Sequence, residues 1–101
     1  MIIYNVTLTA DWSIHDAWLR WVKEEFIPGI LNSNLFQKHQ LVRLLEVDET
    51  YGPTYAIQFY ANSMDDYKRY YTELSGELNK KNYDKWGDKS LAFETIMQVV
   101  H

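Results

Sequence analysis

The order of two hydrophobic patterns along the chain constrains its fold more than any other feature of the 101 residues. Apolar side chains alternate with polar ones or form short apolar runs in four segments, as is typical of β-strands, and they recur every three or four residues in two others, as is typical of helices. The expected strands are residues 2–9, 40–47, 54–61 and 91–100, and the expected helices begin near Ile14 and Ser63. The order strand, helix, strand, strand, helix, strand, with right-handed crossovers, predicts a ferredoxin-like α+β sandwich, in which two helices cover one face of a four-stranded antiparallel sheet.

Local signals predict where the first helix begins and ends. Ser13, three residues before Asp16, resembles a capping pattern at the start of a helix. Pro28 lacks an amide hydrogen and its ring clashes with the preceding turn, so together with Gly29 it should end or sharply bend this helix.

The second helix is less sharply defined by its sequence. Ser63, followed by acidic residues, is a suitable first residue. Gly76 weakens the middle of the helix, and the polar residues 79–82 are compatible with either helix or loop. Trp86 and Gly87 mark the expected end.

Length and composition limit the classes of protein that this chain can represent. A chain of 101 residues is expected to form one ferredoxin-like domain spanning residues 1–101. The net charge of -4 at pH 7 argues against nucleic acid or an anionic membrane as a partner, because phosphate binding depends on clustered Lys and Arg. Cysteine is absent and no apolar run is long enough to cross a bilayer, so a cytoplasmic location is expected.

Strand alternation predicts which side chains face the helices and which face away. The expected helix-facing core is Ile2, Tyr4, Val6, Leu8, Tyr55, Ile57, Phe59, Leu91, Phe93, Met97 and Val99. The expected open face carries Ile3, Asn5, Thr7, Thr9, Ala56, Gln58, Tyr60, Ala92, Glu94, Ile96, Gln98 and Val100. This mixture of apolar and polar residues favours contact with a partner, and the simplest partner is a second copy in a twofold homodimer formed through the open sheet face. A monomer with a hydrated open face is the alternative.

Five polar or charged side chains are candidates for a small-molecule site on the open face. They are Asn5, Arg43, Gln58, Tyr60 and Glu94. Glu94 is the one carboxylate expected in a semi-enclosed place, Tyr60 could stack on a ligand, and Arg43 could clamp an anionic group. The alternative interpretation is a satisfied polar network across a dimer interface, in which Asn5 is an ordinary sheet-face amide.

The sequence contains no recognisable catalytic or metal-binding motif. The three histidines, His15, His39 and His101, have no spacing suited to a metal, so no metal and no cofactor are expected. His39 and Arg43 are four residues apart, which is two same-side positions along a strand, so they are placed on one side of it. His39 is a possible general base, although a solvated edge strand explains it as well. Catalytic residues are therefore unknown. The aromatic segment 52–59 has the wrong phase for an RNA-binding sheet face.

Several segments together resemble a known family. They are the start Met1-Ile-Ile-Tyr-Asn-Val, the helix end Lys23-Glu-Glu-Phe-Ile-Pro, the segments Arg43-Leu-Leu-Glu-Val-Asp and Gly52-Pro-Thr-Tyr-Ala-Ile-Gln, and Trp86-Gly87-Asp88. Nearly the whole chain resembles an uncharacterised bacterial domain-of-unknown-function family among the dimeric α+β barrels. The resemblance implies the fold and a dimeric assembly, and it brings no established activity.

Other proteins with this barrel fold include small monooxygenases, haem-degrading enzymes and isomerases, so the resemblance also raises an enzyme as an alternative. Some of them place an Asn on the first strand, which Asn5 matches, but the axial His of the haem degraders has no counterpart in residues 64–85. The expected function is a homodimeric binding or interaction module without catalysis. The alternative is a small cofactor-free enzyme of the monooxygenase or isomerase type.

Overall fold

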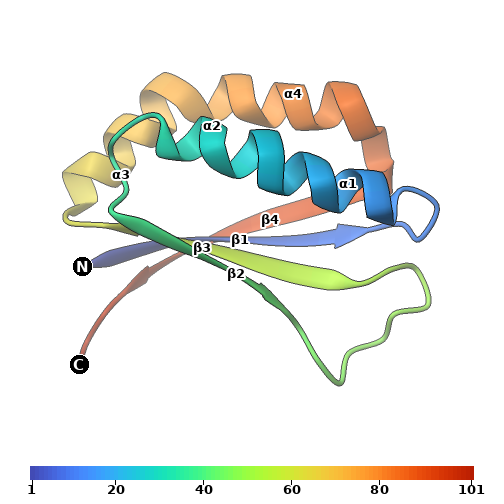
Figure 1. Ribbon diagram of the computed structural model, residues 1–101. Helices are drawn as coiled ribbons and strands as arrows, with labels where there is room; N and C mark the ends of the chain where they lie inside the picture. Colours follow the sequence, from blue (N-terminus) through green and yellow to red (C-terminus); the bar gives the residue numbers. More distant parts are fainter.

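The computed structural model describes residues 1–101 and contains one antiparallel sheet with helices on one side (Figure 1). The strands are β1 (Ile2–Ala10), β2 (Lys38–Arg43), β3 (Thr54–Ala61) and β4 (Ser90–Gln98), and they lie in the order β2-β3-β1-β4. Every neighbouring pair is antiparallel. The predicted ferredoxin-like α+β sandwich is therefore confirmed.

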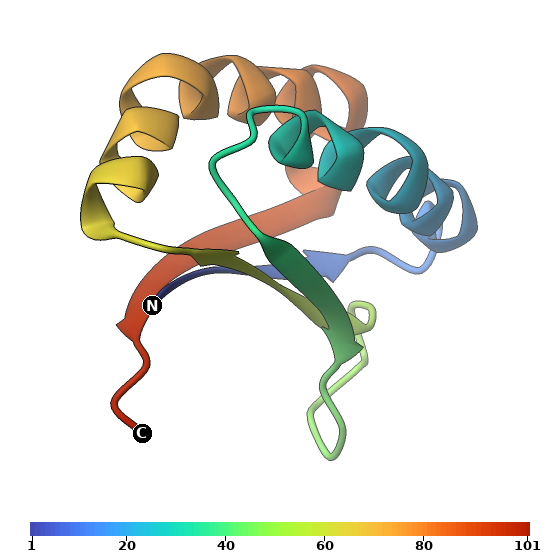
Figure 2. The same ribbon diagram turned by 60° about the vertical axis from the view of Figure 1, so that its left-hand side comes forward.

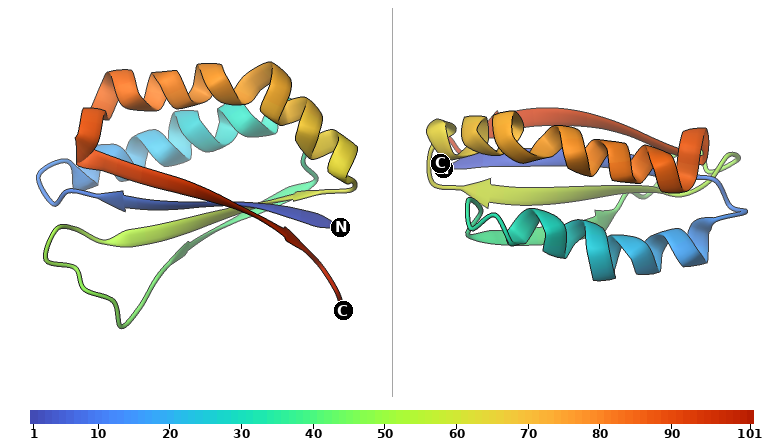
Figure 3. Two further views of the ribbon diagram at one scale, coloured as in Figure 1. Left: turned by 180° about the vertical axis from the view of Figure 1, so that it is seen from behind. Right: turned by 90° about the horizontal axis from the view of Figure 1, so that it is seen from above.

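Each connection between β1 and β2, and between β3 and β4, is a helical rod made of two α-helices joined by a π-helical turn. The first rod consists of α1 (His15–Trp21), a π turn (Val22–Phe26) and α2 (Ile27–Leu31), and the second of α3 (Met64–Tyr70), a π turn (Tyr71–Ser75) and α4 (Gly76–Trp86). A short 3-10 turn, Gly87–Lys89, leads into β4. Both rods cover the same face of the sheet, as the views from behind and from above show (Figure 3). None of these helices is both long and apolar enough to cross a membrane.

Pro28 does not end the first helix, which was one of the two outcomes predicted for it. The π turn ahead of it is wide, and the N–H of Ile27 donates to the carbonyl of Val22, five residues earlier. Pro28 then occupies the first turn of α2, where a missing amide hydrogen is tolerated. The helix continues until the N–H of Asn32 donates to the carbonyl of Pro28 at 2.9 Å.

The other predicted helix ends are partly confirmed. The Ser63 side chain accepts a hydrogen bond from the N–H of Asp66 at 3.2 Å and caps the second rod. This rod passes through residues 79–82 as helix and stops at Gly87, which has a φ of 58°. The cap predicted at Ser13 is wrong, because its own N–H donates to the carboxylate of Asp11 at 2.8 Å and α1 begins without a side-chain cap.

The second and fourth strands are shifted from their predicted limits. β2 ends at Arg43 rather than at residue 47, because Glu46 adopts a φ of 57° and breaks the extended chain. β4 runs from Ser90 to Gln98 instead of over residues 91–100.

The helix-facing core of β1 and β3 is as predicted. Tyr4, Val6 and Leu8 are buried beneath the helices, as are Tyr55, Ile57 and Phe59 on β3. These residues belong to one apolar cluster that the two rods complete, with Trp18, Trp21, Val22, Phe26, Ile27, Ile30, Tyr67 and Tyr70 among its members.

The predicted facing of β4 is wrong. Val6, a core residue, pairs with Glu94, and Tyr4 pairs with Ile96. Residues directly opposite each other in an antiparallel pair share a face, so the even-numbered side chains of β4 point toward the helices. The odd-numbered side chains, Phe93 among them, point away from the helices. Both phases of this strand contain apolar residues, so alternation alone selected the wrong one.

Tyr4 lies at the centre of an aromatic cluster between the sheet and the second rod. Its ring centroid is 5.2 Å from that of Tyr70 and 5.5 Å from that of Tyr67. Burial raises the pKa of the Tyr4 phenol above its usual range, and neighbouring Tyr70 and Glu94 raise it further. Burial also raises the pKa of Tyr70, to about 12.

These shifts predict a loss of stability in alkali. The folded chain keeps the Tyr70 proton up to about pH 12, whereas a tyrosine in the unfolded chain ionises near 10.0. The stabilisation is therefore fully present below pH 10 and is lost as pH rises toward 12. Urea unfolding between about pH 9 and pH 11 should show a falling free energy of unfolding. The fall should be smaller for Tyr70→Phe and unchanged for exposed Tyr83→Phe; equal falls in all three proteins would contradict the prediction.

Candidate functional site

The face of the sheet that carries no helices is concave. Figure 2 shows the sheet arching beneath the two rods, with the hollow side of the arch open and the C-terminus extending to that side. Strand register assigns the side chains of this face: Lys38, Gln40 and Val42 on β2; Thr54, Ala56, Gln58 and Tyr60 on β3; Ile3, Asn5, Thr7 and Thr9 on β1; and Leu91, Phe93, Thr95 and Met97 on β4. The open face is thus polar in its middle and apolar along β4.

An apolar ridge, formed by Leu91, Phe93, Met97 and Val99, runs along this edge strand and the residue after it. Leu91 is 52% exposed and Phe93 66% exposed. The helix-facing side of β4 is also poorly covered, and only Ser90 of its nine residues is buried. A monomeric protein rarely leaves a strand this apolar uncovered on both sides, so the β4 ridge has the properties of a contact surface.

Three of the five predicted site residues lie together in the middle of the open face. Asn5 on β1 pairs directly with Gln58 on β3, and the Tyr60 hydroxyl donates to Oε1 of Gln58 at 3.3 Å. The Asn5 amide donates to the Thr7 hydroxyl at 3.1 Å, and the residue is only 9% exposed. The ammonium group of Lys38 lies 4.6 Å from the centre of the Tyr60 ring. These groups form a polar strip next to the β4 ridge.

The other two predicted residues lie on the opposite side of the sheet. Glu94 pairs with Val6 and faces the second rod. Burial raises the pKa of Tyr67 on that rod, and the charge of Glu94 raises it further. Arg43 pairs with helix-facing Tyr55 and forms an ion pair with Glu49 at 2.9 Å. A single protomer therefore does not bring all five residues into one pocket. The cause is the phase of β4 and β2, on which apolar residues fall on both sides.

His39, the possible general base, lies at the outer edge of the sheet. It is exposed on β2 and pairs with Phe59, whose ring centre is 6.3 Å from its own. Glu94 is on the far edge strand, because the strand order places β2 and β4 at opposite edges. The structure therefore brings no carboxylate of β4 to His39.

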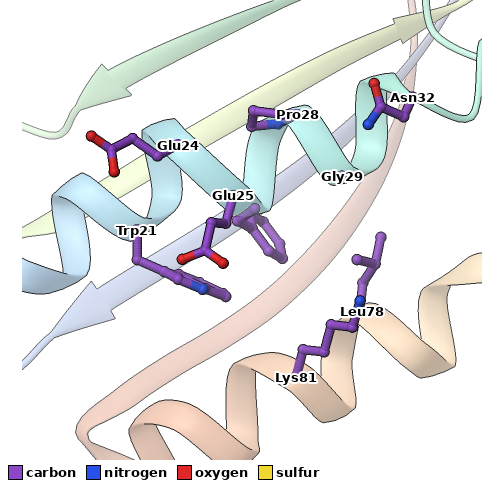
Figure 4. A pocket seen from close by; sticks show the side chains of 9 residues that line it. Trp21, Glu24, Glu25, Pro28, Gly29, Asn32, Leu78 and Lys81 are labelled. Atoms are coloured by element: carbon purple, nitrogen blue, oxygen red, sulfur yellow. The ribbon is translucent and has the colours of Figure 1, made fainter.

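The open face of the protomer contains no enclosed hollow. Three hollows are present, and all are lined by the helical rods or by the turn before α1. One of them is a groove of about 300 Å³ between the rods, where Trp21 and Glu25 of the first rod reach toward α4, which contributes Leu78 and Lys81 (Figure 4). The open face of one protomer is therefore suited to contact with another protein surface rather than to enclosing a small molecule.

One pair of titratable side chains on the helix side was not predicted from the sequence. Nε2 of His15, in the first turn of α1, lies 2.7 Å from the hydroxyl of Tyr55 on β3. The two residues are 40 positions apart, and their contact depends on how α1 docks on the sheet. The one signal for this contact in the sequence is a histidine at the start of an amphipathic helix.

Solved structures with the same fold are found at low sequence identity. An ethyl tert-butyl ether D (EthD) family protein from Bacillus halodurans superimposes with a TM-score of 0.71 at 12% identity, over 99% of this chain and 100% of that one. A dimeric ferredoxin-like protein from an uncultured marine organism gives 0.70 at 12%, over 100% and 96%. SnoaB, a cofactor-independent oxygenase from Streptomyces nogalater, gives 0.69 at 12%, over 99% and 94%. At such identities the similarity shows the fold alone.

Sequence comparison identifies the family. No curated protein matches the chain. A family model described as a domain of unknown function, DUF4286, matches residues 1–100, which confirms the resemblance to an uncharacterised family that the sequence suggested. The protein belongs to this family, the domain of unknown function DUF4286.

Proposed function

We propose that residues 1–101 form a single domain that works as a homodimeric interaction module, with the open faces of two sheets packed against each other. The observation that carries the proposal is the β4 ridge, whose largest member, Phe93, is 66% exposed in the single chain. Two concave faces related by a twofold axis would enclose both ridges. Burying them removes apolar area from water and gives the dimer its stability.

The polar strip has a role in this arrangement. Asn5, Gln58 and Tyr60 lie in the middle of the open face, so a sheet-to-sheet contact desolvates them. Buried amides and hydroxyls need hydrogen-bond partners, which the second copy or a small bound molecule supplies. Two of the similar solved structures are described as dimeric ferredoxin-like proteins, which supports this assembly for the present chain. The absence of cysteine supports a cytoplasmic location, and the net charge of -4 supports partners other than nucleic acid.

Replacement of Phe93 by glutamate tests the proposal. The wild-type protein should sediment as a dimer at micromolar concentration. Phe93→Glu should raise the dissociation constant by about 100-fold or more, because each of two equivalent phenyl groups contributes about 1.5 kcal/mol or more of burial and 1.4 kcal/mol corresponds to a factor of ten. Analytical ultracentrifugation over a concentration series measures this constant directly.

The matched control is Tyr83→Glu. Tyr83 is 68% exposed, as open to solvent as Phe93, but it lies on α4 in the helical layer. This variant should remain dimeric with an unchanged dissociation constant. A monomeric wild-type protein, or a dimer equally sensitive to both substitutions, would overturn the proposed interface.

The alternative function, a small cofactor-free enzyme with its pocket on the open face, has weaker support. Two similar solved structures, both of SnoaB, are described as a cofactor-independent oxygenase, and the polar strip offers hydrogen-bonding groups. However, the candidate carboxylate Glu94 and the candidate clamp Arg43 lie across the sheet from the strip. The open face is therefore better suited to assembly than to catalysis within one protomer.

A further inference from the structure

A second cluster of reactive side chains lies between the start of α1 and the sheet, on the opposite side from the proposed interface. Its centre is the contact of 2.7 Å between Nε2 of His15 and the hydroxyl of Tyr55. The two rings are nearly parallel, with an angle of 13° and centroids 5.8 Å apart. The Trp18 ring packs on Tyr55 at 5.4 Å, so the phenol is held between a buried indole and the imidazole.

The second nitrogen of His15 contacts a carboxylate on the surface of the protein. The side chain keeps 15% of its surface exposed, and Nδ1 lies 3.3 Å from the carboxylate of Asp16. Asp16 is fully exposed and makes no other ion pair, so its side chain can move away from the imidazole. A ligand group can therefore take the place beside Nδ1 that Asp16 now occupies.

A hollow of about 430 Å³ lies beside this imidazole. It is lined by the six consecutive residues Trp12, Ser13, Ile14, His15, Asp16 and Ala17. The Trp12 ring stands edge-on to the His15 ring at 5.5 Å and is almost half exposed. Its Nε1–H donates to the carbonyl of Glu49 at 2.7 Å, so the indole is held in place beside the hollow. A small aromatic ring can pack against this indole while its polar group reaches Nδ1 of His15.

We propose that His15, Tyr55 and Trp12 form a binding site for a small, weakly acidic aromatic compound, a phenol or an enol, whose hydroxyl proton is transferred to His15. Once Asp16 has moved away, the tautomer whose Nε2–H donates to the Tyr55 hydroxyl leaves the lone pair of Nδ1 free to accept. The ligand O–H bond breaks and an Nδ1–H bond forms, giving a phenolate or enolate paired with an imidazolium. No electrons leave the pair and no co-reactant is needed. Trp12 binds the ring of the ligand, and Tyr55 is a positioning residue.

The charged groups around His15 and Tyr55 are compatible with this transfer of a proton from the ligand to His15. Arg43 lies over the Tyr55 ring, 5.9 Å from its centre, and is itself paired with Glu49 at 2.9 Å. Asp16 is the charged group in contact with the imidazole, and the incoming phenol or enol takes its place before the proton moves. The site lies within one protomer and does not depend on the proposed dimer, so the two proposals succeed or fail separately.

A chromogenic phenol that absorbs visible light only as its anion tests the proposal. The probe is 4-nitrophenol, mixed with the full-length protein in a buffer slightly below the pKa of the free phenol. Wild-type protein should lower the apparent pKa of the bound probe by about one unit, which is roughly a tenfold increase in the ratio of anion to acid. The Nδ1 resonance of His15 in ¹⁵N NMR should move toward its protonated position in the same titration.

Three variants complete the experiment. His15→Gln should abolish the absorbance change, and His39→Gln, which removes an exposed imidazole on β2 with no hollow beside it, should leave the change intact. Tyr55→Phe keeps the ring, and should alter the ratio of the two His15 tautomers in the ¹⁵N spectrum and weaken the response. Circular dichroism confirms that each variant is folded. An absorbance change that is absent in the wild type, or equal in His15→Gln, would overturn the site.

Discussion

Replacing Gly52 by alanine is expected to lower the free energy of unfolding by about 3–5 kcal/mol. Gly52 is buried in the loop before β3, where it passes against the end of β1. A methyl group there would lie 1.7 Å from the carbonyl oxygen of Ala10 and 2.7 Å from its carbon. Both are backbone atoms of a central strand, and the next residue, Pro53, accepts a hydrogen bond from the Ala10 N–H at 3.2 Å. The strand end and the loop must therefore separate.

Gly76 provides the matched control for this substitution. It is the first residue of α4, has a helical φ of -61° and is exposed. Apart from its chain neighbours and the backbone of its own helix, no atom lies within 4 Å of an added methyl group. Gly76→Ala should raise the free energy of unfolding by about 0.5–1 kcal/mol, because alanine restricts the unfolded chain and favours the helix. Denaturant titrations at one fixed protein concentration measure both changes. If Gly52→Ala is as stable as the wild type, the loop does not approach β1 as described.

Replacing Trp18 by alanine should have an effect of similar size, about 3–5 kcal/mol. Trp18 is 0% exposed, and its indole fills the space between α1 and the sheet. Its Nε1–H also donates to the Ser90 hydroxyl at 3.1 Å, which connects the first rod to the first residue of β4. Alanine leaves a cavity and removes this donor, so both the packing and the hydrogen bond are lost.

Trp18→Phe separates these two contributions. It keeps much of the ring volume but leaves the buried Ser90 hydroxyl without its indole donor, so the loss should be about 1–3 kcal/mol. Substitution of Tyr83 by alanine, at an exposed position of α4, should change stability by no more than about 0.5 kcal/mol. The three variants are compared by guanidinium titration followed by circular dichroism. Equal stability of Trp18→Ala and Tyr83→Ala would contradict the packing described.

The sequence predicted the facing of a strand correctly where its apolar residues occupied mainly one of the two alternating sets of positions. On β1, even-numbered residues are apolar and odd-numbered ones mostly polar, so the core side was assigned correctly and Asn5 was placed on the open face with Gln58 and Tyr60. On β4, apolar residues occupy both phases, and the choice depends on hydrogen-bond pairing with β1 rather than on the strand itself. For this reason Glu94 was predicted on the open face, whereas it lies on the helix-facing side of the sheet.

The contact between His15 and Tyr55 illustrates a different limit. Periodicity along a helix identifies the buried stripe, but it does not state which strand residue each helical side chain meets. This contact requires α1 to lie along β3 at one particular depth, which the packing of Trp18 on Tyr55 determines. Pro28 shows the same dependence on context, since a wide turn before it lets the helix continue.

The π turn in the first rod also affects how related sequences are to be compared. At this turn the N–H of Ile27 donates to the carbonyl of Val22, five residues earlier, whereas a regular α-helix joins residues four apart. One residue has in effect been inserted into a regular helix, which keeps both halves facing the sheet. In an alignment of homologues, a one-residue gap between these two positions would therefore indicate an uninterrupted α-helix, and the conserved core on either side should still be matched across it.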